Sequence, residues 1–326
     1  MFDKNITWGI IGVGDVCEVK SGPAYQKTKG FSLKSVMRRD LAKARDFAQR
    51  HGIEKYTYNA DELINDPEID AIYIATPPQH HLSFALKVAA ADKICCVEKP
   101  MARNFEECNK MLLPFESKKL PLFVAYYRRT LPRFLKVKEW IDHEKIGEIR
   151  HIHWSLCQPP NPAADYPDFY NWRTDKQIAP GGYFDDLASH GLDLFHFLLG
   201  KFKSVCGQSN NQQNLYAAPD AFTGSWVHEN GITGSGFWNF GTWKKVDKVE
   251  ILGEKGRISF AIFNEEPVRL ETEKEQLSLA IEHPIHVQQY HVEAMRDQLL
   301  YGKAYSSTGK SALHTAWVMD NILGVI

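Results

Sequence analysis

The sequence predicts an α/β protein: an N-terminal doubly wound parallel sheet of the Rossmann type, followed by an α+β part with a large, mostly antiparallel open sheet. Short apolar runs alternate with helical patterns up to about residue 125, which is typical of a parallel sheet with helices on both faces. A glycine-rich turn follows the first run. Longer alternating runs with hairpin signals dominate the later part. We therefore expect a dinucleotide-binding domain over residues 1–125 and a substrate-binding and oligomerisation domain over residues 126–326.

Five short apolar runs predict the strands of the first sheet, and four helical patterns separate or follow them. Asp40 and Asn104 stand just before two of these patterns, where their side chains can cap a helix. The predicted strands are Thr7–Ile11, Phe31–Met37, Ala71–Ala75, Ile94–Val97 and Leu122–Ala125. The predicted helices are Leu41–His51, Ala60–Asn65, His80–Ala91 and Asn104–Ser117.

The second part begins with a helix from Pro132 to about His143, ended by Gly147. Asn230-Gly231 between two alternating runs is a strong hairpin signal, and the polar segment Ser209–Pro219 is expected to be a loop. The predicted strands are Ile149–Leu156, Phe222–His228, Ile232–Phe240, Val246–Leu252, Arg257–Phe263 and Val268–Thr272. The clearest later helices are Gly182–Leu199, Val287–Tyr301 and Gly309–Leu323.

Composition excludes several classes of function. The chain has 326 residues with a formal net charge of −1, so it has no basic field that would hold nucleic acid or an anionic membrane. No apolar stretch is long enough to span a bilayer. The six cysteines form no C-x-x-C pair, and the adjacent His80 and His81 at a helix start point in different directions. His151 and His153 share one strand face but have no third clustered ligand. We expect a reduced, cytoplasmic protein without a metal site.

The glycine-rich turn is the candidate nucleotide site. The segment Gly12-Val13-Gly14-Asp15-Val16-Cys17 follows the first strand and precedes a helix, and we expect Gly12, Val13, Gly14 and Val16 to contact the nucleotide. The first glycine permits a tight turn, and the second lets the backbone approach a pyrophosphate. Cys17 occupies the third glycine position and is still small enough for close packing. The alternative is a plain glycine turn, but the strand–turn–helix context favours a dinucleotide site.

The end of the second strand bears on the choice of cofactor. A site for NAD usually places Asp or Glu here to bind the ribose 2′-hydroxyl, whereas this chain has Arg38 and Arg39 before Asp40. Arginine can form paired hydrogen bonds to a 2′-phosphate, which favours NADP over NAD. Two alternatives remain: the arginines are merely solvated, or Asp40 turns inward and accepts the ribose hydroxyl.

Four motifs occur in order along nearly the whole chain. Together they resemble the glucose–fructose oxidoreductase/inositol dehydrogenase/MocA family of nicotinamide-dependent oxidoreductases. The motifs are the glycine turn, Ala75-Thr76-Pro77-Pro78 with His81, Glu98-Lys99-Pro100, and Gly181-Gly182 followed by Asp186 and His190. Two departures from the family pattern are Cys17, where Gly or Ala is commoner, and Ala188, where glycine is frequent.

The resemblance implies a role for each matched residue. Thr76, Pro77 and a cofactor-proximal His81 would line the cofactor, and Glu98 would approach its nicotinamide end. Trp172-Arg173 resembles the family's Trp-Arg pair near the cofactor. Lys99 would reach the substrate, a sugar, polyol or related ring, and Asp186 and His190 would come from the second domain.

The same residues suit the oxidation of a secondary alcohol. The hydroxyl must lose a proton as hydride departs, and histidine is a suitable general acid or base near neutral pH. Lys99 can polarise the oxygen or share the proton. Asp186 lies four residues before His190, so both face one side of a helix and can reach one substrate. The alternatives are a surface or capping pair, or Asp193 as the residue that holds His190.

Some expectations stay open at this stage. Tyr126 and Arg129 at the domain junction either bind substrate or pack a hinge. The main hypothesis is an NAD(P)-dependent dehydrogenase or reductase acting on CH–OH groups, assembled as a homodimer or homotetramer through the C-terminal sheet. Alternatives are an NAD-dependent glycoside-cleaving enzyme of the same fold and a non-catalytic redox sensor. Loops such as Gln158–Asp168 would set specificity, so the sequence does not name the substrate.

Overall fold

The computed structural model describes residues 5–160 and 171–326 and divides into two compact units. The first unit comprises residues 1–130 and 284–313, and the second comprises residues 131–283 and 314–326. The chain therefore leaves the first unit, builds most of the second, and returns before it ends. Part of the segment 158–168, expected to influence specificity, lies outside the described residues.

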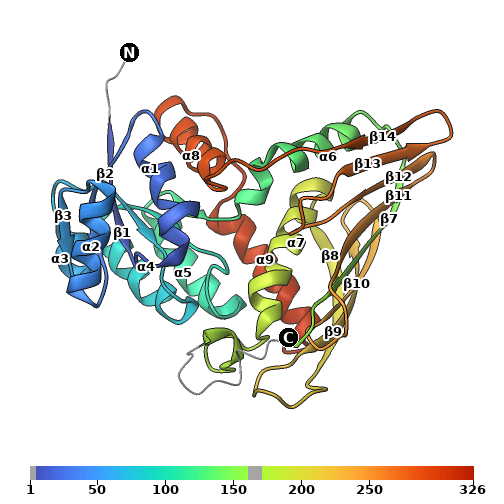
Figure 1. Ribbon diagram of the computed structural model, residues 1–326, viewed down its shortest axis with the longest axis horizontal. Helices are drawn as coiled ribbons and strands as arrows, with labels where there is room; N and C mark the ends of the chain where they lie inside the picture. The colour runs from blue at the N-terminus through green and yellow to red at the C-terminus, as the bar shows by residue number, and fades with distance from the viewer. Residues whose placement is uncertain (1–4, 161–170) are drawn as a thin grey trace. The chain divides into compact units, whose positions relative to one another are not determined.

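The first unit contains a six-stranded parallel sheet (Figure 1). The strand order is β3-β2-β1-β4-β5-β6. Strands β2 and β3 follow on one side of β1 and strands β4 to β6 on its other side, which is the arrangement of a doubly wound fold. The predicted parallel sheet is confirmed, with β3 as an additional short edge strand. The strands are β1 (Ile6–Ile11), β2 (Phe31–Met37), β3 (Lys55–Thr57), β4 (Ala71–Ile74), β5 (Ile94–Val97) and β6 (Leu122–Val124).

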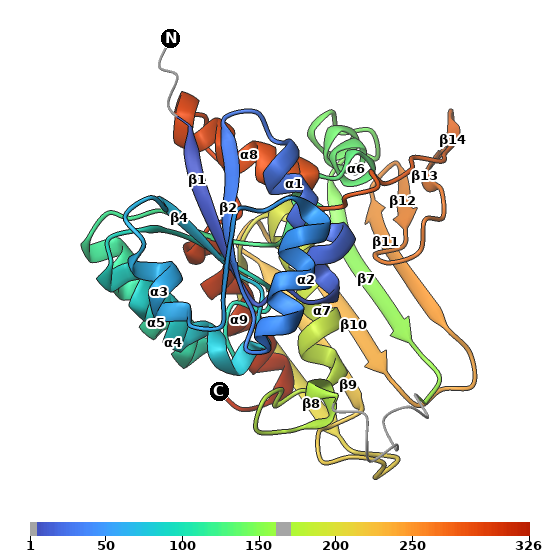
Figure 2. The same ribbon diagram turned by 60° about the vertical axis from the view of Figure 1, so that its left-hand side comes forward.

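Helices cover both faces of this sheet, as Figure 2 shows. On one face α1, α2 and α8 share a core with Trp8 and Ile10 of β1. On the other, α3 lies so close to Gly9 that a Cβ there would come within 2.6 Å of Leu63 Cδ2. The helices are α1 (Gly22–Lys27), α2 (Leu41–His51), α3 (Ala60–Asn65), α4 (His81–Ala90), α5 (Phe105–Ser117) and α8 (Gln289–Tyr301), with short turns η1 (Val16–Lys20), η2 (Pro78–His80) and η3 (Tyr127–Thr130).

The two helix caps that the sequence predicted are present in the structure. Asp40 accepts a hydrogen bond from Lys43 N at 3.1 Å and begins α2. Asn104 accepts one from Glu107 N at 2.9 Å and begins α5. Each bond satisfies a backbone donor that the first turn of a helix leaves unpaired. These caps explain why the predicted starts of the two helices agree with the structure.

The second unit contains an eight-stranded open sheet in the order β14-β13-β12-β11-β7-β10-β9-β8. All neighbours are antiparallel except β7 and β10, which run parallel. The mostly antiparallel sheet is thus confirmed. Its strands are β7 (Ile149–Cys157), β8 (Phe202–Asn210), β9 (Ala221–His228), β10 (Thr233–Asn239), β11 (Val246–Gly253), β12 (Gly256–Phe260), β13 (Val268–Thr272) and β14 (Gln276–Leu279).

One face of this sheet is covered by helices. In α7 (Tyr183–Leu199), Gly191 packs on Trp154 of β7; a Cβ there would lie 2.4 Å from the indole ring. In α9 (Gly309–Leu323), Ile322 packs over Gly224 of β9. The third helix, α6 (Pro132–Asp142), contributes Phe134, whose ring centroid lies 5.8 Å from that of Phe260.

The opposite face of the sheet is mainly polar. Along β7 and β10 it presents His151, His153 and Ser235, which form a chain of hydrogen bonds of 2.9 to 3.0 Å. Phe237 on the same face is 41% exposed. By contrast, the aromatic residues Trp226, Trp238 and Phe240 are buried, and Trp243 is 90% exposed.

Two sequence expectations about strand extent were wrong. Ser209 and Asn210 were expected in a loop, but they belong to β8, an edge strand with few apolar residues. Its Gly207 lies against α9, where a Cβ would meet Ile322 O at 2.5 Å, so a large apolar side chain has no room at that position. The strand predicted to reach Phe263 ends at Phe260. Among the described helices, none has the length and apolar character needed to cross a bilayer.

Candidate functional site

The glycine turn closes tightly onto the loop after β4. Gly12 has φ +96°, which favours glycine, and a Cβ there would lie 2.8 Å from Thr76 Cγ2 and 2.9 Å from Thr76 N. The space beside Gly14 is open, since a Cβ there would meet nothing within 4 Å. Thr76 Oγ1 is buried without a hydrogen-bond partner. A buried polar atom beside an open glycine turn is what a bound polar ligand would satisfy.

The predicted helix after the turn is present but divided into η1 and α1 at Ser21. Val16 is partly exposed at its start, and Cys17 is fully buried against the turn. The backbone packs closely here, since a Cβ at Gly22 would lie 2.3 Å from Cys17 O. The turn and the following helix therefore form one tightly packed element.

Arg38 reaches back from the end of β2 to the glycine turn. Its Nη1 donates to Val13 O at 3.0 Å. Arg39 is exposed, and its charge adds to burial in lowering the pKa of His80. Asp40, which might have accepted a ribose hydroxyl, instead caps α2. The cationic guanidinium, not the neighbouring carboxylate, is thus the group held at the turn.

His81 joins two strand-end loops from within the core. Its Nε2 lies 2.7 Å from Thr76 O and its Nδ1 lies 3.0 Å from Pro100 O. Burial lowers the pKa of this imidazole, although both carbonyls oppose the effect. The side chain is fully buried, so it fixes the loop that carries Thr76 and Pro77 against the loop that carries Lys99.

Glu98 and Lys99 stand at the end of β5. The Glu98 carboxylate is 8% exposed and accepts from Tyr73 OH at 2.6 Å, from Gln288 Nε2 at 2.6 Å and from Lys99 N at 3.0 Å. Lys99 itself is half-buried. Because hydrogen bonds to a carboxylate are strong, this arrangement fixes the backbone from which the Lys99 side chain projects.

In the second unit, the loop with Trp172 and Arg173 is tied to the start of α7. Arg173 Nε donates to Asp186 Oδ2 at 2.6 Å, and its guanidinium stacks 4.4 Å from the Trp172 ring centre. Asn171 Nδ2 donates to Tyr183 OH at 2.7 Å. The structure thus joins Arg173, predicted at the cofactor, with Asp186, predicted at the substrate.

Asp185 has a role that the sequence interpretation passed over. Its Oδ2 accepts from Gly181 N at 2.8 Å, and the side chain is 5% exposed. Burial raises the pKa of Asp185 to about 7, the Gly181 N–H opposes this, and the carboxylates of Asp320 and Asp186 add to it. This carboxyl holds the glycine pair that precedes α7. Its position three residues after the N-cap Gly182 is a capping signal that the sequence contains.

His190 lies one turn after Asp186 on α7 and is also buried. Its ring meets Phe263 edge to face, with centroids 5.7 Å apart. Asp193, the alternative partner for His190, is 1% exposed and accepts from Thr315 Oγ1 at 3.2 Å. Asp186 and His190 therefore form a buried polar stripe on the helix, as their spacing predicted.

Tyr126 and Arg129 are buried at the end of the first segment of the first unit. Tyr126 is 2% exposed and Arg129 is 3% exposed. Arg129 Nη1 donates to Ser306 O at 3.0 Å, which ties this segment to the returning one. Asp186 and His190 are buried as well, so burial does not separate the two roles, and the substrate-binding role of Tyr126 and Arg129 stays a prediction.

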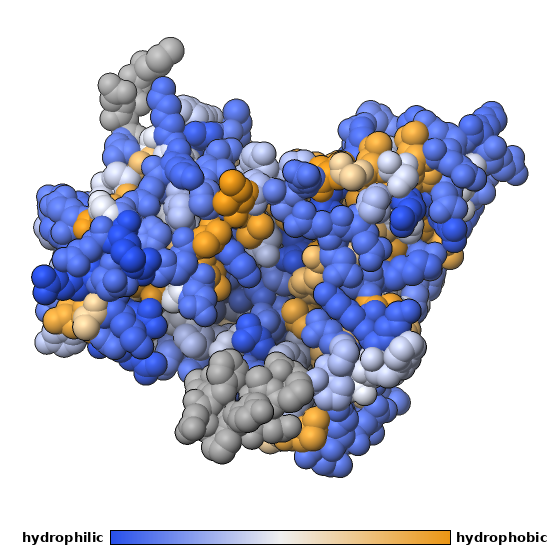
Figure 3. Space-filling model, viewed as in Figure 1, coloured by the Kyte–Doolittle hydropathy of each residue, from blue (hydrophilic) through white to orange (hydrophobic). Residues whose placement is uncertain are grey.

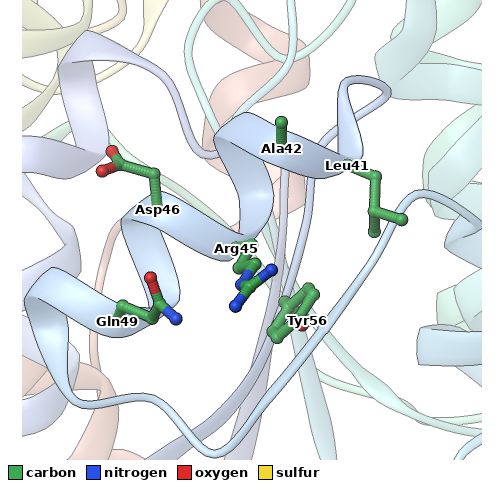
Figure 4. Close-up of a pocket in the computed structure, with 6 residues that line it drawn as sticks. All are labelled: Leu41, Ala42, Arg45, Asp46, Gln49 and Tyr56. Atoms are coloured by element: carbon green, nitrogen blue, oxygen red, sulfur yellow. The ribbon is translucent and has the colours of Figure 1, made fainter.

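A groove on the exposed side of α2 contains none of the predicted site residues (Figure 4). Figure 3 shows mainly hydrophilic side chains over this helix, whose apolar residues Ala44, Phe47 and Ala48 face the core. The groove is lined by Leu41, Ala42, Arg45, Asp46, Gln49 and Tyr56. Within residues 5–160 and 171–326, no cluster of His, Cys, Asp or Glu has an arrangement suited to a metal ion.

The predicted residues thus gather in two groups, one in each unit. Gly12, Arg38, Thr76, Glu98 and Lys99 belong to the first, all at the carboxyl ends of its parallel strands. Arg173, Asp186 and His190 belong to the second. Tyr73 and Gln288, which hold Glu98, carry no signal in the sequence that marks them as site residues. Gln288 is 190 positions from Glu98, and no local pattern links them.

The sequence matches two family models. Residues 6–126 match the model described as "Oxidoreductase family, NAD-binding Rossmann fold", and residues 134–259 match "GFO/IDH/MocA C-terminal domain". "Oxidoreductase P35" of Formosa agariphila is 36% identical over 324 residues, which cover 99% of each chain. "Levoglucosan dehydrogenase" of Pseudarthrobacter phenanthrenivorans is 33% identical over 162 residues, covering 50% of this chain and 41% of that protein.

The fold is also similar to solved structures. A structure titled "Levoglucosan dehydrogenase, complex with NADH and levoglucosan" superposes with a TM-score of 0.84. The match covers 98% of this chain and 97% of that one at 23% sequence identity. At this identity the similarity supports the two-part α/β architecture.

Proposed function

Because this chain belongs to the GFO/IDH/MocA family of oxidoreductases with an NAD-binding Rossmann fold, we propose that it transfers hydride between NADP(H) and a secondary alcohol or carbonyl of a sugar or polyol. The observation that carries the proposal is the cationic glycine turn beside the fixed Glu98-Lys99 backbone. The levoglucosan dehydrogenase among the relatives favours a carbohydrate-like substrate.

The residues around the turn fit a dinucleotide. The open space beside Gly14 allows close approach of a pyrophosphate, and Thr76 Oγ1 has no partner within the protein. The Arg38 guanidinium offers further donors to a 2′-phosphate, while Asp40 is occupied as a helix cap. We therefore favour NADP, with NAD as the alternative. The bound nicotinamide would supply the hydride donor or acceptor.

The proton would be handled by side chains of this chain. Lys99 would donate a hydrogen bond to the reacting oxygen, which stabilises the negative charge that develops there. His190 would take the hydroxyl proton during oxidation and return it during reduction. Asp186 would bind a neighbouring hydroxyl, with Arg173 fixing its orientation. This mechanism requires Lys99 of the first unit and His190 of the second to reach the same substrate.

The direct test is cofactor titration by fluorescence, followed by a panel of sugars and polyols monitored at the nicotinamide absorbance band. We expect NADP to bind and at least one cyclic sugar or polyol to give net cofactor reduction. Catalysis without net change in the nicotinamide would instead identify glycoside cleavage. Cofactor binding without turnover of any substrate would favour the redox sensor.

Arg38→Ala should weaken NADP binding about 10- to 100-fold while changing NAD binding less than about threefold. The reason is that the arginine would contact the 2′-phosphate, a group that NAD lacks, and charge-assisted hydrogen bonds are worth more than neutral ones. Dissociation constants of both cofactors for both proteins provide the measurement.

Arg45→Ala is a matched control because Arg45 is an exposed arginine on the neighbouring helix α2, in the groove of Figure 4. It should leave both affinities unchanged. An equal loss of NADP and NAD affinity in Arg38→Ala would show that the arginine only supports the fold of the turn, and would remove the basis for preferring NADP.

We further infer that the chain forms a homodimer or homotetramer through the open face of the second unit's sheet. Phe237 and Leu252 are large apolar side chains, 41% and 42% exposed, on that mainly polar face. Light scattering should give a mass of two or four chains, and Phe237→Arg should lower it. A monomeric wild-type protein would disprove this assembly.

A further inference from the structure

We propose that Gln288 is a positioning residue that couples the helix after the glycine turn to Lys99, through the buried carboxylate of Glu98. The inference rests on the proposed function, because Lys99 is assigned there as the group that contacts the reacting oxygen. Gln288 lies at the start of α8, in the segment that returns to the first unit, and is 1% exposed.

Gln288 forms hydrogen bonds with both its backbone and its side chain. Its backbone N–H donates to Lys20 O, the last residue of η1, at 3.2 Å. Its side-chain Nε2 donates to Glu98 Oε1 at 2.6 Å. One residue therefore touches both the element that follows the glycine turn and the carboxylate next to Lys99.

The position of the Glu98 carboxylate depends on its hydrogen bond from Gln288. The carboxylate is nearly buried, and its bonds to Gln288, Tyr73 and Lys99 N all come from neutral donors. A buried carboxylate that loses a donor is strongly disfavoured, and we infer that Glu98 then shifts toward another donor. Because Oε2 accepts from Lys99 N, any such movement shifts the Lys99 backbone.

The surrounding segment holds Gln288 in place. His286 Nδ1 donates to Val19 O at 2.6 Å, and its Nε2 accepts from Lys27 Nζ at 2.6 Å. Further along α8, His291 lies 3.7 Å from Cys96 Sγ and 2.6 Å from Tyr305 OH. Figures 1 and 2 both show α8 beside α1, in agreement with their contacts. The segment from His286 to His291 thus contacts both the helix after the glycine turn and strand β5.

Two variants remove one donor each from the same oxygen, Glu98 Oε1. Gln288→Met keeps the length of the side chain but loses its N–H groups, and Tyr73→Phe loses only the hydroxyl. We expect each to lower kcat about 10-fold, with the Kd for NADP changed less than about threefold. Their effects on kcat should not add in the double variant, since both act through one carboxylate.

Gln289→Met is the matched control. Gln289 is adjacent in the chain, but its Nε2 bonds Thr28 Oγ1 at 3.2 Å and Glu293 Oε1 at 2.8 Å, away from Glu98. It should leave kcat unchanged. Equal losses of kcat in Gln288→Met and Gln289→Met, or additive losses in the Gln288/Tyr73 double variant, would overturn the proposal and reduce Gln288 to a packing role.

A second readout does not depend on activity. In protein labelled with ¹⁵N-lysine, the Lys99 amide signal can be assigned by its disappearance in Lys99→Met. Gln288→Met and Tyr73→Phe should both shift this signal, whereas Gln289→Met should not. An unmoved signal in Gln288→Met would overturn the coupling. Absence of turnover in the wild-type enzyme would instead reject the proposed function, while the amide signal would still decide the role of Gln288.

Discussion

Lys99→Met is expected to lower kcat by about 10²- to 10³-fold, the loss typical of removing one hydrogen-bond donor to a developing oxyanion. Methionine keeps the length of the apolar stem but has no N–H group to donate a hydrogen bond to the reacting oxygen. The backbone N–H of residue 99, which bonds Glu98 Oε2, is retained, so the strand end should keep its structure. Steady-state kinetics with saturating NADP and substrate measure the change.

Affinity for the cofactor separates a chemical from a structural effect in this variant. The Kd for NADP should change less than about threefold, because the glycine turn and Arg38 are untouched. His190→Ala should produce a loss of kcat in the same range with the same retained affinity. If both variants turned over at the wild-type rate, the catalytic assignment would be wrong.

Asp185→Asn is expected to stabilise the protein strongly at pH 8 and hardly at all near pH 4. Burial raises the pKa of Asp185 from 3.8 to about 7 in the folded state. Between these values the folded state retains a proton that the unfolded chain has lost, so this group lowers stability progressively as pH rises. Above pH 7 this group lowers the free energy of unfolding by its full amount, about 4 kcal/mol from the difference between the two pKa values.

Asparagine removes the ionisable group but keeps an oxygen for the Gly181 N–H, which the carboxylate accepts at 2.8 Å. The urea midpoint of unfolding, measured at pH 4, 6 and 8, should therefore differ from wild type by an amount that grows with pH. Glu282→Gln, at an exposed position, is a suitable control and should show no such trend. A pH-independent difference for Asp185→Asn would contradict the raised pKa.

Local sequence signals were reliable where one element determines its own ends. The strands Phe31–Met37 and Ile94–Val97 and the helix Leu41–His51 have the predicted bounds. Apolar runs buried on both faces and a side-chain cap at Asp40 are properties of the local sequence. The Asn230-Gly231 turn joined β9 to β10 for the same reason, with Gly231 at φ +87°.

Elements whose character depends on distant partners were missed. The edge strands β3 and β14 are short, and β8 is largely polar because one of its sides faces no neighbour. The parallel pairing of β7 with β10 joins segments about 80 residues apart, and no local pattern encodes it. Edge strands need little apolar surface, so periodicity detects them poorly.

By itself, the sequence determined the glycine turn, the order of the two sheets, the family, and the placing of Asp186 and His190 on one helix. Each of these features depends only on neighbouring residues or on a fixed spacing along the sequence. Only the tertiary structure decided that Arg38 bonds Val13 while Asp40 caps α2, that Arg173 pairs with Asp186, and that Gln288 returns to Glu98. These contacts depend on where side chains point and on chain segments that meet only after folding, which spacing along one chain does not record.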